Sequence, residues 1–312
     1  MKVEFIAGRI NFKPNTFMKT ILLPTDFSPN SANAAKYAAA LTSQIKGKLL
    51  LVHVLGPETA ATSEGGVISL PPDIRLELFY QNKLLKLSKQ LRLDYGFLFE
   101  LETMCVQGAI PEELNKIIQR KKVDLVVMGT KGANGFLEKL SGTTSAGFMK
   151  EAGSPVLIIP GNARFQNIKN ITYASNFEKD ETIFLQQLLQ FTQPFSPAIS
   201  ILNIKSDDQI DLVCDNQILE EIQTQFPEQF FNIFQVEADD VVKGIHQFIT
   251  QSQADILAVS IPGKPFLEEL FHRSISRQLA YTSQIPLLAL PARPFKLSAP
   301  AKSARLASQP AV

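Results

Sequence analysis

Short apolar runs alternate with longer amphipathic segments along most of this chain. Runs that predict buried strands occupy residues 21–23, 49–54, 97–106, 123–128 and 155–160. Predicted helices lie between them at 30–45, at 73–93 and from Pro111, which suits the first turn of a helix. The polar stretch 56–72 contains Gly and Pro and is interpreted as a loop. Strands and helices that alternate at this spacing predict an open, doubly wound parallel sheet of five strands.

The same order of elements occurs a second time. Residues 171–177 match residues 21–27 at an offset of 150, and residues 285–291 match residues 154–160 at an offset of 131. The second copy is therefore shorter, and most of its missing residues fall between its second and third strands, where loops tolerate deletion. This internal repeat predicts two tandem α/β domains.

The repeat and the composition around it define four segments. We expect an extra N-terminal segment at 1–17, a first domain at 18–161, a second domain at 168–291 and a disordered tail at 292–312, which is rich in Pro, Ala, Ser and Lys. Two interpretations of the N-terminal segment stay open. Met18 is the true start, or residues 1–17 form an arm that packs on the body of the protein.

Composition limits the classes of function. A chain of 312 residues with 45% hydrophobic and 20% charged residues suits two globular domains, and a net charge of +1 provides no field to attract nucleic acid or an anionic membrane. The cysteines, Cys105 and Cys214, indicate neither a disulfide framework nor a metal cluster and are interpreted as small buried hydrophobes. No apolar run approaches the ~20 residues that span a bilayer. A cytoplasmic protein is expected.

A glycine-rich stretch follows the strand predicted at 123–128. Gly129, Gly132 and Gly142 are spaced G-x2-G-x9-G, and Thr143 and Thr144 follow where a helix begins. Backbone N–H groups and hydroxyls at a helix N-terminus are suited to binding a phosphate chain, and glycine removes the Cβ that would obstruct close approach. The alternative is a structural turn without a ligand. The nearby lysines, Lys131 and Lys139, are interpreted as solvated side chains.

The carboxyl ends of the strands locate this cradle beside an acid. In a doubly wound sheet, ligands bind where the strand order reverses, which here places the first and fourth strands side by side. Asp26 would then meet Gly129 across the crevice, and its carboxylate suits a hydroxyl or amino donor on the non-phosphate part of a nucleotide. The alternative role for Asp26 is to cap the first helix.

With these residues in view, the domain resembles the universal stress protein family, and the chain resembles its tandem two-domain form. The opening residues 18–28 resemble the start of the family, and Gly129-x2-Gly132-x9-Gly142-Thr143 matches its ATP-binding pattern G-x2-G-x9-G-[S/T]. The resemblance implies an adenine-nucleotide alpha-hydrolase-like fold and ATP as the ligand, with or without Mg²⁺. The implied contacts are Pro24, Thr25, Asp26, Val54, Met128, Gly129, Gly132, Gly142, Thr143 and Thr144.

The second copy departs from this pattern. Asn176 replaces Asp26, Ser260 stands over Gly129, and Arg273 stands near the position where backbone has to approach phosphate. The second domain is therefore predicted not to bind ATP in the manner of the first. The family resemblance also implies that strands 156–159 and 287–290 pair antiparallel, so that the chain forms an intrachain pseudo-dimer and covers two sheet edges.

The favoured function is an ATP-binding regulatory or stress-response protein that binds an adenine nucleotide and an unknown protein partner, with or without homodimer formation. The alternatives are a slow ATPase or nucleotide-dependent transferase that uses the same crevice, and a flavin or redox protein of similar fold. We expect no catalytic residues, metal site, nucleic acid or membrane partner. The histidines His53, His246 and His272 are interpreted as packing or surface residues, and residues 226–234 as a core strand.

Overall fold

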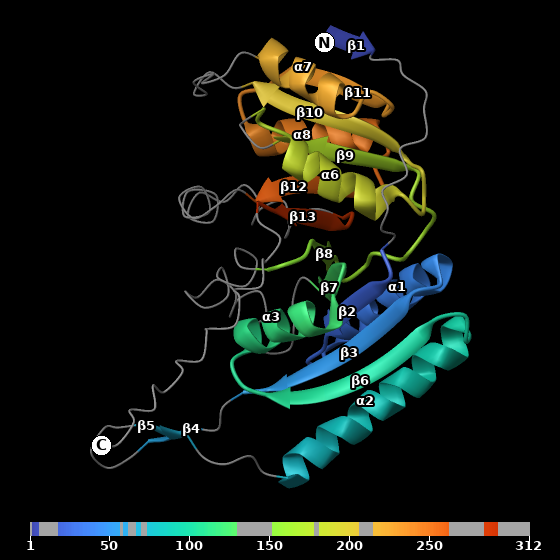
Figure 1. Ribbon diagram of the computed structural model, residues 1–312, viewed down its shortest axis with the longest axis vertical. Helices are drawn as coiled ribbons and strands as arrows, with labels where there is room; N and C mark the ends of the chain where they lie inside the picture. Colours follow the sequence, from blue (N-terminus) through green and yellow to red (C-terminus); the bar gives the residue numbers. More distant parts are fainter. Residues whose placement is uncertain are drawn as a thin grey trace, which may run out of the picture.

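The computed structural model describes residues 2–5, 18–56, 59–61, 67–69, 74–129, 152–177, 181–205, 215–261 and 284–292 (Figure 1). The first domain contains β2 (Thr20–Pro24), α1 (Pro29–Ile45), β3 (Lys48–Leu55), α2 (Ile74–Tyr95), β6 (Glu100–Gln107), α3 (Ile110–Lys121), β7 (Leu125–Gly129) and β8 (Val156–Ile159). The second contains β9 (Asn170–Ala174), α6 (Glu181–Thr192), β10 (Ala198–Lys205), α7 (Asp215–Gln225), β11 (Phe231–Glu237), α8 (Val241–Gln251), β12 (Ile256–Ile261) and β13 (Leu287–Pro291).

Both domains have the same strand order. The first domain is ordered β8-β7-β2-β3-β6 and the second β13-β12-β9-β10-β11, with parallel pairing inside each domain. The predicted neighbours β2 and β7 pair through Ile21 with Leu125 and Leu22 with Val126. The predicted doubly wound topology is confirmed, and the strand order reverses between β2 and β7 in the first domain.

One antiparallel pair joins the two domains. Leu157 of β8 lies opposite Leu288 of β13, with Ile158 opposite Leu287 and Val156 opposite Ala289. Together with β1 (Lys2–Phe5), which pairs with β11, the two five-stranded sheets therefore form a continuous sheet of eleven described strands (Figure 1). This confirms the predicted intrachain pseudo-dimer, in which each domain covers the sheet edge that its partner would otherwise expose.

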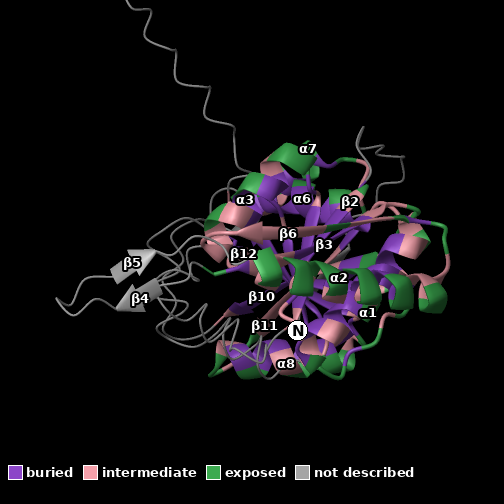
Figure 2. Ribbon diagram, turned by 90° about the horizontal axis from the view of Figure 1, so that it is seen from below, coloured by how far each residue is buried: buried purple, intermediate pink, exposed green. Residues whose placement is uncertain are grey.

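Successive side chains of a strand point to opposite faces of the sheet, so these continuous apolar runs need helices on both faces to bury them. In β2, Ile21 and Leu23 pack toward α1 and α2, whereas Leu22 packs into the core beneath α3. The second domain repeats this arrangement, with α6 and α7 on one face and α8 on the other. Figure 2 shows the resulting layers, with buried strands between helices whose outer surfaces are exposed.

Matching local contacts show that the copies are structurally equivalent. Asp124 Oδ2 accepts hydrogen bonds from Lys19 N and Thr20 N, both at 2.8 Å. Asp255 Oδ2 makes the same pair of contacts with Lys169 N and Asn170 N, at 2.7 and 2.8 Å. In each domain, this carboxylate ties the start of the fourth strand to the start of the first.

Two segments differ from what the sequence pattern indicates, and a third, at the N-terminus, agrees with one of the two interpretations left open. Residues 2–5 form β1 (Lys2–Phe5), which pairs antiparallel with β11, so at least this part of the N-terminal segment packs on the body. The stretch interpreted as a loop contains a separate ribbon of β4 (Thr59–Ala61) and β5 (Val67–Ser69). The predicted core strand at 226–234 begins only at Phe231, and Phe230 is 47% exposed.

The seam between β8 and β13 predicts a strong effect of truncation. We expect Leu157→Ala and Leu288→Ala each to lower the free energy of unfolding by about 2–5 kcal/mol, because both side chains are fully buried. Since they face each other, the double variant should show a coupling energy above about 0.5 kcal/mol. Leu98→Ala, at a side chain that is 70% exposed, is the control. Equal small losses at all three sites in urea denaturation would contradict this prediction.

Candidate functional site

Six of the predicted ligand residues lie at the strand ends where the strand order reverses. Pro24 ends β2, and Thr25 and Asp26 follow it directly. Met128 and Gly129 end the neighbouring strand β7, and the sixth residue, Val54, lies near the end of β3. The structure therefore brings the acid and the first glycine to adjacent strand ends. The remaining predicted contacts lie outside the described residues, as do the lysines discussed with them: Lys131, Gly132, Lys139, Gly142, Thr143 and Thr144.

Asp26 has one occupied and one unoccupied carboxylate oxygen. Oδ1 accepts a hydrogen bond from Ser28 N at 3.0 Å, whereas Oδ2 is buried and has no hydrogen-bond partner among the described residues. Ser28, rather than Asp26, caps α1, because its side chain accepts from Ser31 N at 3.2 Å. The capping role considered for Asp26 is therefore wrong. A buried carboxylate oxygen without a donor is costly, and a ligand that supplies a donor would remove that cost.

Thr25 fixes the turn that carries Asp26. Its N–H donates to Val52 O at 2.8 Å, and its Oγ1 lies 2.6 Å from Ser31 Oγ in α1. The same Oγ1 accepts from Phe27 N at 3.1 Å, and Phe27 has a left-handed φ of 62°. Strand β3, the turn and the first turn of α1 are thus connected through one residue. Thr25 therefore fixes the conformation of the turn that precedes Asp26.

Gly129 has a packing role that is visible without any ligand. A Cβ built on this residue would lie 2.8 Å from Asn30 O in the first turn of α1, which is closer than real Cβ atoms approach a backbone oxygen. The glycine therefore lets α1 come close to the end of β7. Met128 and Val54 point away from α1 and belong to the core on the α3 face, so their side chains pack rather than project into solvent.

An aromatic cluster that the sequence pattern did not reveal lies beside Asp26. The His53 and Tyr80 rings stack with centroids 4.1 Å apart, and Phe27 lies 5.0 Å from His53. Lys83 Nζ lies 4.8 Å from the centroid of the Phe27 ring. The signal available in the sequence was the position of His53, which continues the Leu49 and Leu51 alternation at the carboxyl end of β3. Its partners on α2 are distant in sequence.

The environment of His53 favours its neutral form. Burial lowers the pKa of His53, and the positive charge of Lys83 lowers it further. The Thr25 carbonyl and the carboxylate of Asp26 oppose this shift but do not reverse it. Its cross-strand neighbour is Cys105 of β6, whose own pKa is raised by burial and by Glu77. Cys105 is half-buried rather than buried, although it packs against the core, and Cys214 lies outside the described residues.

The corresponding place in the second domain is filled by a buried polar network. Glu181 accepts hydrogen bonds from Tyr173 Oη and from Ser175 Oγ, both at 2.6 Å. Tyr173 is fully buried, and its pKa is raised well above the ordinary value by burial and by the charge of Glu181. Ser260, which stands where the first domain has Gly129, lies near this hydroxyl and opposes the rise in the pKa of Tyr173. Arg273, the other substitution predicted to matter here, lies outside the described residues, as does His272.

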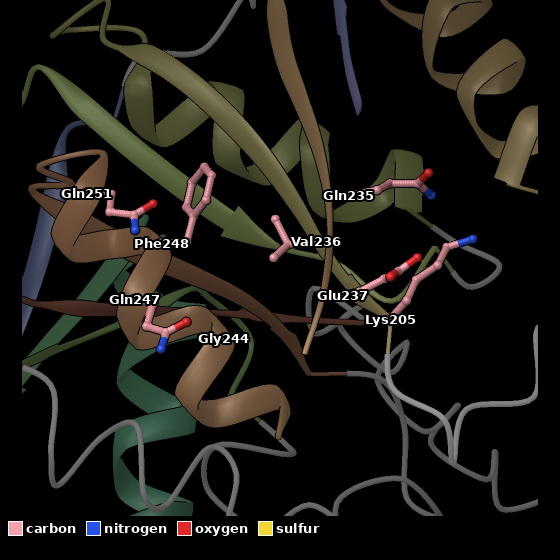
Figure 3. Close-up of a pocket in the computed structure, with 8 residues that line it drawn as sticks. All are labelled: Lys205, Gln235, Val236, Glu237, Gly244, Gln247, Phe248 and Gln251. Atoms are coloured by element: carbon pink, nitrogen blue, oxygen red, sulfur yellow. The ribbon is translucent and has the colours of Figure 1, made fainter. Parts of the chain in front are cut away.

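Two hollows in the described part of the chain lie away from this crevice. One, of about 510 Å³, opens between α8 and the ends of β10 and β11 and is lined by Lys205, Gln235, Val236, Glu237, Gly244, Gln247, Phe248 and Gln251 (Figure 3). Another, of about 370 Å³, lies where α6 approaches the start of β7. Neither lies at the carboxyl ends of β2 and β7. Within the described ranges, no cluster of His, Cys, Asp or Glu is arranged to hold a metal ion, and no helix is sufficiently long and apolar to cross a bilayer.

The sequence of the first domain is similar to sequences of known proteins. Residues 18–160 match the model of the universal stress protein family. Universal stress protein MJ0531 of Methanocaldococcus jannaschii is 28% identical over 157 residues, which cover 50% of this chain and 89% of that protein. Universal stress protein MJ0577 of the same organism is 28% identical over 155 residues, with 45% and 94% coverage.

A solved structure resembles the chain over both domains. The crystal structure of a universal stress protein from Archaeoglobus fulgidus has a TM-score of 0.63 and 17% sequence identity, and the match covers 88% of this chain and 97% of that one. At this identity, the similarity shows the fold. It agrees with the two-domain arrangement described above.

The contact at Gly129 predicts a stability effect that is independent of any ligand. We expect Gly129→Ala to lower the free energy of unfolding by about 1–3 kcal/mol, because the new methyl group would press on Asn30 O. Gly56→Ala is the matched control, since a Cβ there meets nothing within 4 Å. Thermal and urea denaturation without nucleotide would measure both. An unchanged stability for Gly129→Ala would show that α1 can retreat without cost.

The lowered pKa of His53 predicts a pH effect with a defined sign. As pH falls below the ordinary value of 6.5, the unfolded chain takes up a proton before the folded chain does. The stability that depends on neutral His53 is therefore complete above this pH and declines toward the folded pKa. His53→Asn removes this titration. We compare the free energies of unfolding of wild type and variant by urea titration. The value for wild type minus the value for the variant should decrease as pH is lowered from 7.5 to 5. An increase would contradict the prediction.

Proposed function

Residues 18–160 belong to the universal stress protein family, and from this premise we propose that the chain is an ATP-binding stress-response protein. The nucleotide occupies the crevice of the first domain. The second domain serves as a built-in partner that completes the sheet. The activity proposed is binding, with regulation of an unidentified protein as its consequence, rather than turnover of ATP.

The observation that carries this proposal is the unoccupied oxygen of Asp26. Oδ2 is buried at the carboxyl end of β2 and has no donor among the described residues, while Oδ1 is held by Ser28 N. Adenine and ribose both carry hydrogen-bond donors, from which a carboxylate oxygen can accept. The position agrees with the rule that ligands bind outside the strand ends at the reversal of strand order. Asp26 would therefore bind the adenosine part.

The residues that follow β7 support the proposed binding of the phosphates. Gly129 ends this strand beside Asp26, and the sequence then places Gly132, Gly142 and Thr143 at the family's spacing. Backbone N–H groups at the beginning of a helix attract phosphate oxygens. We propose that Gly132, Gly142, Thr143 and Thr144 hold ribose and phosphates, and that Mg²⁺, where present, is bound through the phosphates.

Two substitutions support a non-binding second domain. Glu181 occupies the position that corresponds to Ser31, and its carboxylate lies within a fully paired network with Tyr173 and Ser175. A negative charge here would repel phosphates. Asn176 replaces the acid that we assign to the adenosine part. The polar groups that a nucleotide would use in the first domain are thus replaced or already bound to one another.

The proposal predicts one nucleotide per chain and a specific loss at Asp26. Isothermal titration calorimetry with ATP should give a stoichiometry of one. Asp26→Asn should weaken binding by about tenfold to a hundredfold, because it replaces a charged acceptor, which contributes ~1.5–3 kcal/mol, by a neutral amide. The amide retains the acceptor for Ser28 N, so the fold should be unaffected.

Asn176→Asp is the matched control in the second copy and should leave the affinity for ATP unchanged. A stoichiometry of two, or no binding at millimolar ATP, would contradict the proposal. Release of phosphate from Mg-ATP at a sustained rate would instead favour the alternative of a slow ATPase. Mass spectrometry of nucleotide released on denaturation would identify the ligand.

A further inference from the structure

His53 donates a hydrogen bond to the residue that immediately precedes Asp26. Its Nδ1 lies 2.7 Å from Thr25 O, and because a carbonyl oxygen can only accept, Nδ1 carries the hydrogen. The N–H of Thr25 is also bound to β3, through Val52 O at 2.8 Å. Both backbone groups of Thr25 are therefore held by one strand. This fixes the direction in which the chain enters Asp26.

The imidazole ring is itself held in place from two sides. Tyr80 of α2 stacks on it at 4.1 Å and an interplanar angle of 27°, and Phe27 packs at 5.0 Å and 47°. Lys83 lies above the Phe27 ring. A side chain held by such contacts keeps its hydrogen bond in one geometry, which is what a residue that positions another group requires.

The second copy provides an internal comparison. Asn203 stands where the first copy has His53, and its Nδ2 donates to Ser175 O at 3.1 Å. Ser175 N is bound to Leu202 O at 2.9 Å, as Thr25 N is bound to Val52 O. In each copy, the carbonyl at this position therefore accepts a side-chain hydrogen bond, from His53 in the first and from Asn203 in the second. An amide reproduces the hydrogen bond but not the aromatic ring.

We propose that His53 is a positioning residue of the first-domain crevice, and that through Thr25 it aims Asp26 at the exocyclic amine of the nucleotide base. This inference rests on the proposed function. Adenine carries an amine that donates to a carboxylate, whereas hypoxanthine carries a carbonyl oxygen at the same position, which a carboxylate repels. A correctly aimed Asp26 therefore selects ATP over inosine triphosphate. An Asp26 that can turn away loses this selectivity.

Two substitutions separate the hydrogen bond from the ring. His53→Phe keeps an aromatic ring in contact with Tyr80 and Phe27 but has no donor for Thr25 O. His53→Asn keeps the donor, as Asn203 does in the second copy, and loses the ring. Asn203→Leu removes the equivalent donor from the second copy and serves as the control. Circular dichroism and melting curves confirm folding of each variant.

The measurement is the ratio of dissociation constants for inosine triphosphate and ATP. We expect wild type to prefer ATP by about tenfold or more, which corresponds to one hydrogen bond to a charged group. His53→Phe should lose most of this preference, whereas His53→Asn and Asn203→Leu should retain it within about threefold. A merely structural role for His53 would weaken both nucleotides equally and leave the ratio unchanged.

The outcomes distinguish this inference from the function on which it rests. No binding of ATP by wild type contradicts the proposed function. Binding of ATP with no preference over inosine triphosphate, or an unchanged preference in His53→Phe, overturns the role of His53 alone. Should His53→Phe not fold, imidazole ¹⁵N resonances of the wild type decide. We expect a protonated Nδ1 whose resonance changes on addition of ATP, and an unprotonated Nδ1 or an unchanged spectrum overturns the inference.

Discussion

The antiparallel contact between β8 and β13 is the interaction on which the rest of the structure depends. Without it, each domain would end in a strand with one unpaired edge and fully buried side chains such as Leu157 and Leu288. Such an edge invites association with other chains. Because each domain supplies the missing neighbour of the other at this edge, the second domain covers the β8 edge of the first whether or not it binds a ligand.

This division of roles explains how the two crevices can differ so much on the same scaffold. The contacts that hold the sheet are duplicated, as Asp124 and Asp255 show. Around the crevice, the residue types change. Ser31 corresponds to Glu181, and the side chain of Glu181 is fully engaged with its neighbours. The first copy instead leaves Asp26 Oδ2 without a described partner. The second copy has an unpaired buried oxygen of its own, Asn203 Oδ1, but this is a neutral amide oxygen. An unpaired carboxylate oxygen at the reversal of strand order is found only in the first copy among the described residues, and it is the more costly group to leave without a donor.

Most of the fold could be predicted from the sequence, because apolar runs with regular spacing determine strands that are buried on both faces. The points that the sequence left open or missed have specific causes. β1 (Lys2–Phe5) is too short to show a period, and its pairing with β11 is a tertiary contact. Ser28 rather than Asp26 caps α1, a choice between two suitable residues that only geometry decides. The cluster around His53 joins β3 to Tyr80 on α2 through packing that no spacing rule encodes.

Comparison of the two copies explains why residue 129 is a glycine. A glycine is usually explained either by close packing or by a ligand, and here the packing explanation is visible as the contact with Asn30 O. Yet the second copy builds the same sheet with Ser260 at this position. The fold therefore does not require this glycine. In the first copy, Gly129 is required because the start of α1 comes close to the end of β7. This close approach brings the turn that contains Asp26 next to the end of β7, where the glycine pattern begins. The packing role of Gly129 thus belongs to the crevice of the first domain.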